Sequence, residues 1–409
     1  MKSERIYPAV AVSKKAEASI RAGHPWVYDT EIRAAPAMEE NGCLADVFSE
    51  KGAYLGTGFW SGASKIRLRL LSRNANETFG GAFWRRRVDY ALSYRRAVMG
   101  GDYPRCCRII FGEADGFPGL TADRYGDLLV CEVLSAGMER VRDVVYRALC
   151  DAFSEQGAPL AGIFERNESP LRVKEALPQG KGWYPCDFAG RPDSPVTRIT
   201  ENGILYDVDV ENGQKTGFFL DQKYNRQAVA RLAAGRRVLD CFTHTGSFAL
   251  NAAAGGAQHV TAVDVSRAAI EMAQANAERN GLADRMDFVQ ADVFDLLPSL
   301  CGKGTSYDFI ILDPPAFTKS RLTVDSARRG YKEINYRAMK ALPRGGFLAT
   351  CSCSHFMTDE LFRRMLREAA LDAEVSLRLI EARRQAPDHP MLLQVPETDY
   401  LKFYLFQIV

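Results

Sequence analysis

From about residue 216 onward, short apolar runs alternate with segments in which apolar residues recur every three or four positions. The runs predict strands, and the periodic segments predict helices. The predicted strands cover 237–240, 260–264, 287–291, 307–313, 347–351, 376–380 and 401–408, and the predicted helices begin at 247 and cover 268–280 and 358–371. Strands and helices that alternate in this way form a parallel sheet with helices on both faces. The pattern therefore predicts an α/β fold with a doubly wound, Rossmann-like sheet.

The preceding residues follow a different pattern. Residues 1–75 contain short β-rich pieces separated by glycines, which is typical of a small β-rich domain. A polar break then leads into a helical pattern over 83–99, and mixed strands and helices continue to about residue 195. We therefore predict three domains: a β-rich domain at 1–75, a central α+β domain at 76–195, and the doubly wound domain at 196–409.

Composition narrows the class of protein. The chain has 409 residues, of which 46% are hydrophobic, and a formal net charge of +2. No apolar stretch approaches the roughly 20 residues that span a bilayer, and the first residues lack the apolar core of a signal peptide. The ten cysteines are therefore expected to be reduced, in a cytoplasmic protein without a membrane segment. Cys351 and Cys353 with His355 have no second ligand pair at zinc spacing, so no metal site is predicted.

Arginines occur beside aromatic residues in the first third of the chain. Arg67 and Arg69 lie in a strand-like stretch, and the arginine run 85–87 directly follows Trp84. Guanidinium groups next to aromatic faces are suited to bind phosphates and unstacked bases. The alternative is a solvated helix face whose long side chains cover apolar surface. For any single arginine here the pattern does not separate the two interpretations.

A strand, a tight turn and a helix start are predicted around Asp240 and Gly246, and the next strand ends at Asp264. An acidic residue at that strand tip is placed to bind ribose hydroxyls. The turn has one glycine, not the G-x-G-x-x-G that admits a pyrophosphate, which favours a ligand without phosphates. S-adenosylmethionine fits, with Asp264 at the ribose, Asp292 at the adenine amino group, and Asp240 with Gly246 near the methionine end. A single aspartate also caps helices, so the prediction depends on their recurrence at successive strands.

Two reactive groups follow the fourth and fifth predicted strands. The apolar run Phe309–Leu312 ends in Asp313-Pro314-Pro315, and the strand after Gly346 carries Cys351 and then Cys353. The carboxyl ends of parallel strands meet at one edge of a sheet, so a carboxylate and a thiol are expected to lie close together there. A carboxylate facing a thiolate suggests covalent chemistry on a pyrimidine.

These segments and several others resemble a known family. The similarity is carried by Lys215–Gln222, Asp313–Ser320, Arg329–Asn335, Cys353–Met357 and Arg384–Pro390, and near the start by Gly23–Tyr28. They look like the bacterial large-subunit ribosomal RNA cytosine-5 methyltransferase family, over essentially the whole chain. The resemblance implies an RNA-binding PUA β-barrel, a central α+β domain and an S-adenosylmethionine-dependent methyltransferase domain, in that order.

The resemblance also implies which residues bind the cofactor, S-adenosylmethionine. Those residues are Thr216, Gly217, Phe218, Phe219, Asp221, Gln222, Asp240, Phe242, Thr245, Gly246, Asp264, Val265, Asp292, Val293, Asp313 and Pro314. The implied partner is 23S ribosomal RNA or a large-subunit precursor. The candidates for RNA binding are Arg67, Arg69, Arg85, Arg86, Arg87 and Lys319. A homodimer is compatible with the family, but the sequence identifies no interface.

The implied reaction methylates carbon 5 of a cytosine. That carbon is a poor nucleophile, so a thiolate first adds to carbon 6 and makes an enamine whose carbon 5 attacks the methyl group. Cys353 is the predicted nucleophile, because related RNA cytosine-5 methyltransferases place this thiol seven residues beyond a glycine pair, which ends here at Gly346. Asp313 is the predicted general acid at the ring nitrogen, a role that needs a raised pKa. The base that removes the carbon 5 proton is not identified.

Other interpretations stay open. Cys351 competes for the role of nucleophile, and two buried strand cysteines without a covalent step are the structural alternative. A methyltransferase acting on a guanine nitrogen in ribosomal RNA would also use Asp-Pro-Pro but would not need Cys353. A non-catalytic RNA-binding ribosome assembly factor would bind RNA without turnover. Ala316 stands where the family often has lysine, and His355 where it often has a small residue, which leaves the target nucleotide open.

Overall fold

The structure is a computed structural model that describes residues 6–301, 307–318 and 320–409. The chain divides into two compact units. The first unit consists of Met1–Ile199, Asp207–Leu220 and Pro387–Thr398, and the second of Thr200–Tyr206, Asp221–Ala386 and Asp399–Val409. The three domain boundaries drawn from the sequence stay predictions.

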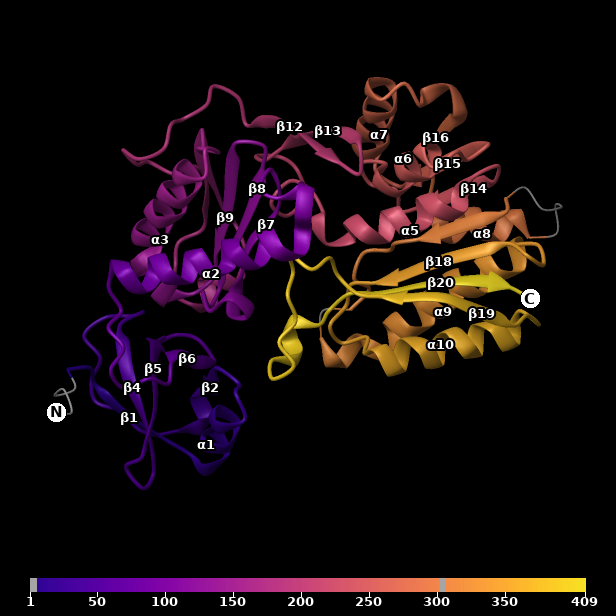
Figure 1. The fold of residues 1–409 in the computed structure, drawn as a ribbon. Coiled ribbons are helices and arrows are strands. Elements are labelled where there is room, and N and C mark those ends of the chain that lie inside the picture. Colours follow the sequence, from indigo (N-terminus) through magenta and orange to yellow (C-terminus); the bar gives the residue numbers. More distant parts are fainter. Residues whose placement is uncertain (1–5, 302–306, 319) are drawn as a thin grey trace. The chain divides into compact units, whose positions relative to one another are not determined.

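The first unit begins with a six-stranded sheet in the order β2-β6-β5-β4-β1-β3, drawn in indigo in Figure 1. Its strands are β1 (Ala9–Val12), β2 (Trp26–Tyr28), β3 (Ile32–Ala34), β4 (Leu44–Ser49), β5 (Tyr54–Trp60) and β6 (Ile66–Ser72). Helix α1 (Lys14–Arg21) is capped by Ser13, whose hydroxyl accepts from the Ala16 N–H at 3.2 Å. The helix buries Ala16 and Ile20 in the core of this sheet. Val10, Val12, Ala45 and Val47 of the strands line the same core.

A five-stranded sheet in the order β11-β10-β9-β8-β7 follows in the same unit. Its strands are β7 (Cys106–Phe111), β8 (Leu120–Tyr125), β9 (Leu128–Val133), β10 (Gly162–Asn167) and β11 (Gly180–Trp183), and its helices are α2 (Gly81–Met99), α3 (Ala136–Glu155) and α4 (Leu171–Lys174). The hairpin of β12 (Val196–Glu201) and β13 (Ile204–Asp209) carries the chain from the first unit to the second and back.

The second unit is built on a seven-stranded sheet in the order β16-β15-β14-β17-β18-β20-β19. Its strands are β14 (Arg237–Cys241), β15 (His259–Asp264), β16 (Met286–Gln290), β17 (Phe309–Leu312), β18 (Phe347–Ser352), β19 (Leu377–Arg383) and β20 (Lys402–Ile408). The first five are parallel, whereas β20 runs antiparallel to both β18 and β19. The strand order reverses between β14 and β17, which is where open parallel sheets bind ligands.

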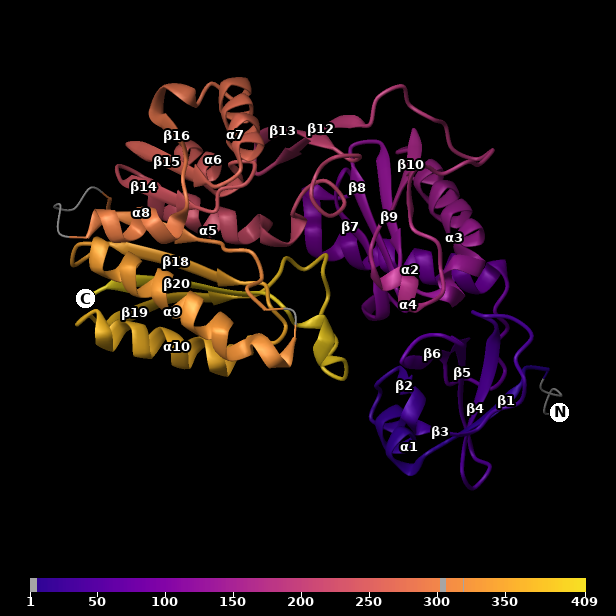
Figure 2. The same cartoon turned by 180° about the vertical axis from the view of Figure 1, so that it is seen from behind.

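Helices cover both faces of this sheet. They are α5 (Lys223–Ala233), α6 (Ser247–Ala254), α7 (Arg267–Arg279), α8 (Val293–Leu300), α9 (Val324–Ala341) and α10 (Asp359–Asp372). Figures 1 and 2 show α5, α6 and α7 on one face and α8, α9 and α10 on the other. Short 3₁₀ turns complete the chain: η1 (Asp29–Glu31), η2 (Gly100–Asp102), η3 (Gly112–Asp115), η4 (Leu220–Gln222), η5 (Ala283–Arg285), η6 (Arg321–Thr323) and η7 (Pro396–Thr398).

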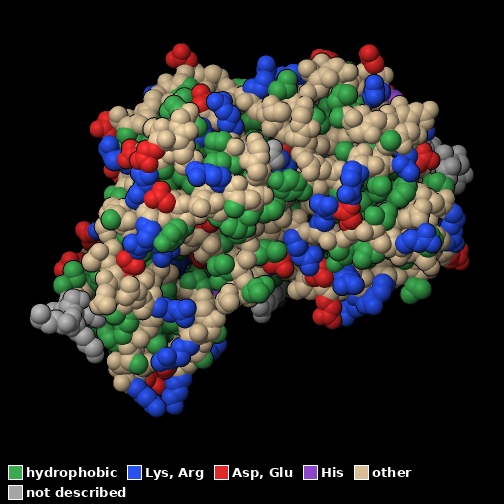
Figure 3. Space-filling view, viewed as in Figure 1, with side chains coloured by type: hydrophobic (Ala, Val, Ile, Leu, Met, Phe, Trp, Pro, Cys, Tyr) green, Lys and Arg blue, Asp and Glu red, His purple; other side chains and the backbone are tan. Residues whose placement is uncertain are grey.

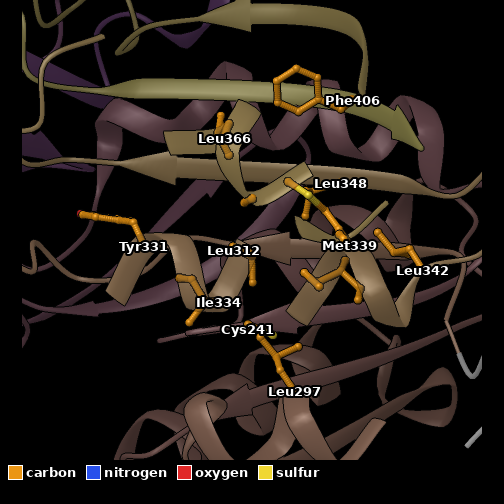
Figure 4. Close-up of a cluster of buried hydrophobic side chains, with 14 of the residues drawn as sticks. Cys241, Leu297, Leu312, Tyr331, Ile334, Met339, Leu342, Leu348, Leu366 and Phe406 are labelled. Atoms are coloured by element: carbon orange, nitrogen blue, oxygen red, sulfur yellow. The ribbon is translucent and has the colours of Figure 1, made fainter. Parts of the chain in front are cut away.

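The main core of the second unit lies between the sheet and the α8, α9 and α10 layer. Figure 4 shows Leu312 and Leu348 from the sheet facing Leu297, Ile334 and other apolar side chains of these helices. All four are fully buried or nearly so. This packing fixes the ends of β17 and β18, which carry Asp313 and Cys353, relative to each other.

The doubly wound α/β fold predicted from the sequence is confirmed, and its predicted strands fall within a few residues of the observed ones. Helices α5, α8 and α9 were not predicted. Helix α8 has only eight residues with Pro298 inside it. The buried residues of α9 recur every three or four positions, but Gly330 inside it lowers the local helix propensity. Among the described residues, no helix combines the length and apolar character needed to cross a membrane.

Candidate functional site

The parallel strands β14 to β18 end at one edge of the seven-stranded sheet, which we call the carboxyl edge. The loop that leaves β14 there has three residues in the left-handed region: Phe242 at φ 65°, His244 at φ 50° and Gly246 at φ 80°. A Cβ on Gly246 would lie 2.9 Å from the Ala273 Cβ, so only glycine fits. Two non-glycine residues held at positive φ mark a loop whose shape is imposed for a reason other than local preference.

Asp264 and Asp292 lie beside this loop. The Asp264 carboxylate accepts from the backbone N–H groups of His244, at 3.0 Å, and Ser266, at 2.9 Å. Asp292 caps α8 and accepts from the Phe294 N–H at 2.8 Å. Each carboxylate keeps lone pairs for further donors, since two oxygens provide about four acceptor sites. The site therefore presents anchored acceptors of the kind that hold ribose hydroxyls and an amino group.

Apolar side chains stand next to these two carboxylates. Val265 follows Asp264 and is 67% exposed, and Phe294 on α8 is 39% exposed. Val293, between Asp292 and Phe294, points into the core instead. Exposed apolar groups beside fixed polar acceptors suit a flat heterocycle such as adenine.

Three carboxylates at the carboxyl edge, Asp221, Asp240 and Asp313, form what we call the acidic cluster. Burial raises the pKa of Asp240 to about 7, and the charge of Asp313 adds to this effect. Burial, followed by the charge of Asp221, raises the pKa of Asp313 to about 7. Asp240 Oδ1 and Asp221 Oδ1 are buried and accept no hydrogen bond from any described residue. Buried acceptors without hydrogen-bond partners cost free energy. A donor or a cation from outside the chain would therefore bind favourably at this cluster.

Asp313 is oriented by neighbours that hydrogen-bond to it. Gln222 Nε2 donates to Asp313 Oδ1 at 3.0 Å, and Asn225 Nδ2 donates to the other end of the Gln222 amide at 2.6 Å. The Cys351 thiol also hydrogen-bonds to Asp313. Cys351 is fully buried inside β18, and burial together with the Asp313 charge holds its pKa well above the usual value. Cys351 is therefore a partner of Asp313 and a poor nucleophile.

Cys353 lies beyond the end of β18 and is half-buried. The next residue, Ser354, takes part in two hydrogen bonds that fix its position. Its hydroxyl donates to the Thr318 carbonyl at 3.0 Å, and its own carbonyl accepts from Lys402 Nζ at 2.6 Å. The residue is thus partly exposed, while hydrogen bonds hold the backbone that follows it.

Burial raises the pKa of the Cys353 thiol to about 12. The charges of Asp313 and Asp221 add to this effect, and Lys402 opposes it. Burial also lowers the pKa of Lys402 to about 8. His355, two residues further on, is exposed and makes an edge contact with Phe356.

The residues present fit S-adenosylmethionine. Its adenosine needs acceptors for two ribose hydroxyls and an amino group, which Asp264 and Asp292 provide. Its methionine end carries a sulfonium and an ammonium, and the acidic cluster offers unpartnered carboxylate oxygens to them. Thr245 and Pro314 are buried at the same edge of the sheet. Most of the residues predicted for the cofactor are therefore gathered here.

The predicted cofactor residues at 216–219 belong to the first unit. Thr216 Oγ1 donates to Asp123 Oδ2 at 2.6 Å, and Tyr125 Oη donates to the Phe218 carbonyl at 2.9 Å. Gly217 has φ 131°, and a Cβ there would lie 2.7 Å from the Val208 side chain. Thr216, Gly217, Phe218 and Phe219 thus lie in a different unit from the carboxyl edge, and their predicted role stays a prediction.

The arginines predicted to bind RNA differ in how far they are buried and in how many hydrogen bonds they make within the first unit. Arg69 is buried and pairs with Glu175 at 2.8 Å, while half-buried Arg67 donates to the Ser61 carbonyl at 2.7 Å. Arg87 donates to the carbonyls of Gly116 and Leu71, and burial lowers its pKa to about 10.

The other two arginines of the run 85–87 form ion pairs near the surface: Arg85 with Glu155 and Asp89, and Arg86 with Glu77. Lys319 lies outside the described residues. Lys and Arg side chains also show at the lower end of the first unit in Figure 3. The exposed cations of the N-terminal sheet and α1 include Lys14, Lys15, Arg21, Arg33 and Lys51.

Two residues of the site were missed by the sequence analysis, Lys402 and Phe294. Lys402 interrupts the apolar run Leu401–Phe406, and a lysine inside a buried strand is a signal in itself. Phe294 could be suspected because it is an apolar residue on the first turn of α8 directly after Asp292. Gln222 was predicted at the cofactor, and the structure shows it donating to Asp313.

Comparison with known proteins identifies families and relatives that together cover nearly the whole chain. A profile of the S-adenosylmethionine-dependent methyltransferase family matches residues 184–407, and a profile of a PUA-like domain matches residues 10–73. A protein named ribosomal RNA large subunit methyltransferase I from Aeromonas hydrophila is 40% identical over 395 residues, which are 96% of this chain and 98% of that protein. The protein of the same name from Klebsiella pneumoniae strain 342 is 36% identical over 408 residues, 100% of both chains.

Solved structures agree on the fold. A Streptococcus mutans protein described as a SAM-dependent methyltransferase has a TM-score of 0.81 and 22% identity, over 98% of this chain and 99% of that one. A second methyltransferase, complexed with S-adenosylhomocysteine, has a TM-score of 0.82 and 22% identity, with the same coverage. The doubly wound sheet with an N-terminal PUA-like domain is thus a known arrangement.

Proposed function

This chain belongs to the ribosomal RNA large subunit methyltransferase I family of S-adenosylmethionine-dependent methyltransferases, and from this membership we propose that it methylates carbon 5 of a cytidine in 23S ribosomal RNA. The relatives' name supports ribosomal RNA of the large subunit as substrate. Carbon 5 of cytosine and a covalent Cys353 adduct are the finer part of the proposal and depend on the site itself.

The observation that carries the proposal is the arrangement of Asp313 and Cys353. The two residues follow the neighbouring parallel strands β17 and β18, and the charge of Asp313 acts directly on the Cys353 thiol. Asp313 has a pKa of about 7, so it holds a proton in a substantial fraction of molecules at neutral pH. A thiol and a carboxylic acid side by side are what addition to a pyrimidine needs, whereas methylation of a guanine nitrogen needs no thiol.

The reaction uses the residues as follows. The Cys353 thiolate adds to carbon 6 of the cytosine while Asp313, held by Gln222, gives its proton to the ring nitrogen that gains charge. Bound S-adenosylmethionine supplies the methyl group that carbon 5 of the resulting enamine takes up. A base then takes the carbon 5 proton and the carbon–sulfur bond breaks, so that Cys353 returns as the thiolate. The ring nitrogen gives its proton back to the Asp313 carboxylate. The target base must leave its stack to reach Cys353.

The proposal assigns the RNA contacts outside the reaction centre to the PUA-like domain and α2. Among the predicted candidates, Arg86 is exposed, and Arg67, Arg85 and Arg87 are half-buried. Phosphate contacts of this kind position the RNA without reading the base. A homodimer and a cytoplasmic location stay predictions.

The experiment is identification of the methylated nucleoside. We would incubate the enzyme with isotope-labelled S-adenosylmethionine and unmodified large-subunit ribosomal RNA, digest the RNA, and analyse nucleosides by mass spectrometry. We expect label in 5-methylcytidine, and we expect Cys353→Ala to lower the rate by at least about 1,000-fold, as loss of a nucleophile does. Label in a methylguanosine that survives Cys353→Ala would contradict the proposal.

Cys351→Ala is the matched control. It removes a thiol two residues away that hydrogen-bonds to Asp313 and is fully buried. We expect it to keep the 5-methylcytidine product with a rate loss of about tenfold, because Asp313 loses one partner. Equal losses in the two variants would mean that the thiols serve the fold and not the reaction.

A further inference from the structure

Lys402 is a buried lysine beside the predicted nucleophile. It is the first residue of β20 and pairs in register with Ser352, the last residue of β18. Its side chain is 3% exposed. Nζ donates to the carbonyl of Ser354 at 2.6 Å and to that of Tyr400 at 2.7 Å. The lysine therefore holds the backbone directly after Cys353.

The ammonium has no carboxylate partner within ion-pair distance among the described residues. Two of its three N–H groups are used by the carbonyls, and one remains. The titratable and charged groups that act on it are Cys353, Asp399, Arg384 and Asp359, with Cys353 first. A buried cation without an ion-pair partner is costly, and an anion that arises beside it during the reaction would offset that cost.

The electrostatic surroundings of Cys353 point the same way. Asp313 and Asp221 disfavour its ionisation, whereas Lys402 and a backbone hydrogen bond at Cys353 itself favour it. At neutral pH the lysine is mostly protonated, because its pKa of about 8 lies above that pH. An anionic sulfur beside it would raise that pKa further.

We propose that Lys402 is a positioning residue for Cys353: its ammonium fixes the backbone that follows Cys353 and stabilises the thiolate that adds to the base. This inference rests on the proposed function. On ionisation of Cys353, the thiol gives its proton to water, and Lys402 stays protonated throughout. The sulfur electron pair then forms the bond to carbon 6.

The test is the alkylation rate of Cys353 by iodoacetamide, measured without RNA or cofactor and read by mass spectrometry of the peptide that contains it. Only the thiolate reacts, so at fixed pH the rate follows the thiolate fraction. At about pH 8, we expect Lys402→Met to slow the alkylation about tenfold, which corresponds to one pKa unit. Lys402→Arg keeps the charge and is expected to stay within about threefold of the wild type.

Asp221→Asn is the control of opposite sign. Asparagine can still accept from the Tyr400 hydroxyl, which donates to Asp221 Oδ2 at 2.6 Å, but it removes a negative charge that disfavours the thiolate. We expect this variant to speed the alkylation. If the role of Lys402 were purely structural, removing its positive charge and removing the negative charge of Asp221 would not change the alkylation rate in opposite directions.

Equal alkylation rates for the wild type, Lys402→Met and Lys402→Arg would overturn the inference. Thermal unfolding and S-adenosylmethionine binding are measured for each variant, and if Lys402→Met does not fold, Lys402→Gln carries the same test with a neutral donor. The alkylation rate does not depend on which nucleoside is methylated. A wrong proposed function would show in the nucleoside product, and a wrong role for Lys402 would show in this rate.

Discussion

The two units bury carboxylates in opposite ways. In the first unit, Asp123 and Asp388 form with Arg108 and His389 what we call the paired cluster. Asp123 accepts from Arg108 Nε and Nη2, both at 2.7 Å, and Asp388 accepts from the Arg108 N–H at 2.9 Å and lies 2.8 Å from His389 Nδ1. Every oxygen of these two carboxylates has a partner. In the acidic cluster of the second unit, one oxygen of Asp221 and one of Asp240 have no hydrogen-bond partner among the described residues.

The pKa values follow the same division. Burial alone pushes the pKa of Asp388 upward, but His389 and the bonds from Arg108 bring it below the usual value. Burial raises the pKa of Asp240 and Asp313 to about 7, and the cations nearby do not reverse it. A buried carboxylate that is paired loses stability when its partner is removed, whereas buried carboxylates left uncompensated are typical of a site that binds a ligand or a proton.

The largest expected effect comes from breaking the paired cluster. Arg108→Met leaves the Asp123 carboxylate buried with Thr216 as its remaining side-chain donor, and we expect a loss of about 3–5 kcal/mol in the stability of the first unit. Calorimetric unfolding measures it. The double variant Arg108→Met with Asp123→Asn is the control and should recover part of the loss. A single variant as stable as the wild type would mean that the pair contributes nothing.

Neutralising the acidic cluster should have the opposite sign. The raised pKa of Asp240 means that the folded state binds its proton more tightly than the unfolded chain, so the ionised carboxylate costs stability as pH rises from about 4 to about 7. Asp240→Asn should therefore stabilise the second unit by about 2 kcal/mol near pH 8, and by little below about pH 4. Melting temperatures across this pH range test the prediction, and a destabilised variant near pH 8 would contradict it.

Cofactor binding should depend on pH for the same reason. A bound sulfonium favours ionised carboxylates, so S-adenosylmethionine affinity should rise about tenfold as pH goes from about 6 to about 7.5. S-adenosylhomocysteine has no charge on sulfur and is the matched control, with a weaker dependence expected in calorimetric titrations. Identical pH profiles for the two ligands would show that the acidic cluster does not face the sulfonium.

The smallest effect concerns the exposed arginines of α2. Arg86→Ala breaks an exposed ion pair with Glu77, and we expect a stability change within about 0.5 kcal/mol. If Arg86 contacts a phosphate, the salt dependence of RNA binding should weaken by about one unit of slope. Glu77→Ala is the control, since it breaks the same ion pair without removing a cation. An unchanged slope in Arg86→Ala would make this arginine part of a solvated helix face.

The fold could be predicted from the sequence where its patterns are regular. The strands β14 to β18 are short apolar runs that end in polar residues, so the α/β architecture and the position of Asp264 and Asp313 at strand ends followed directly. Helix α9 was not predicted, although its buried residues recur every three or four positions, because Gly330 inside it lowers the local helix propensity.

The candidate site could be predicted only in part. Residues at the carboxyl ends of strands could be predicted, because these ends lie at the same edge of a parallel sheet. Contacts between side chains were not, since no spacing shows that the Cys351 thiol bonds to Asp313 or that Lys402 reaches the Ser354 carbonyl. The arginine run 85–87 shows the converse: its composition is uniform, but Arg87 is bound to carbonyls while Arg86 is exposed.

The central claim is that Cys353 forms a covalent bond to a cytosine, and trapping tests it most directly. RNA in which 5-fluorocytidine replaces cytidine carries fluorine where a proton must leave, so the adduct cannot resolve. With S-adenosylmethionine present, we expect the wild type and Cys351→Ala to form a protein–RNA complex that survives denaturing electrophoresis, and Cys353→Ala to form none. A complex that persists in Cys353→Ala, or no complex from a wild-type enzyme that methylates ordinary RNA, would contradict the account.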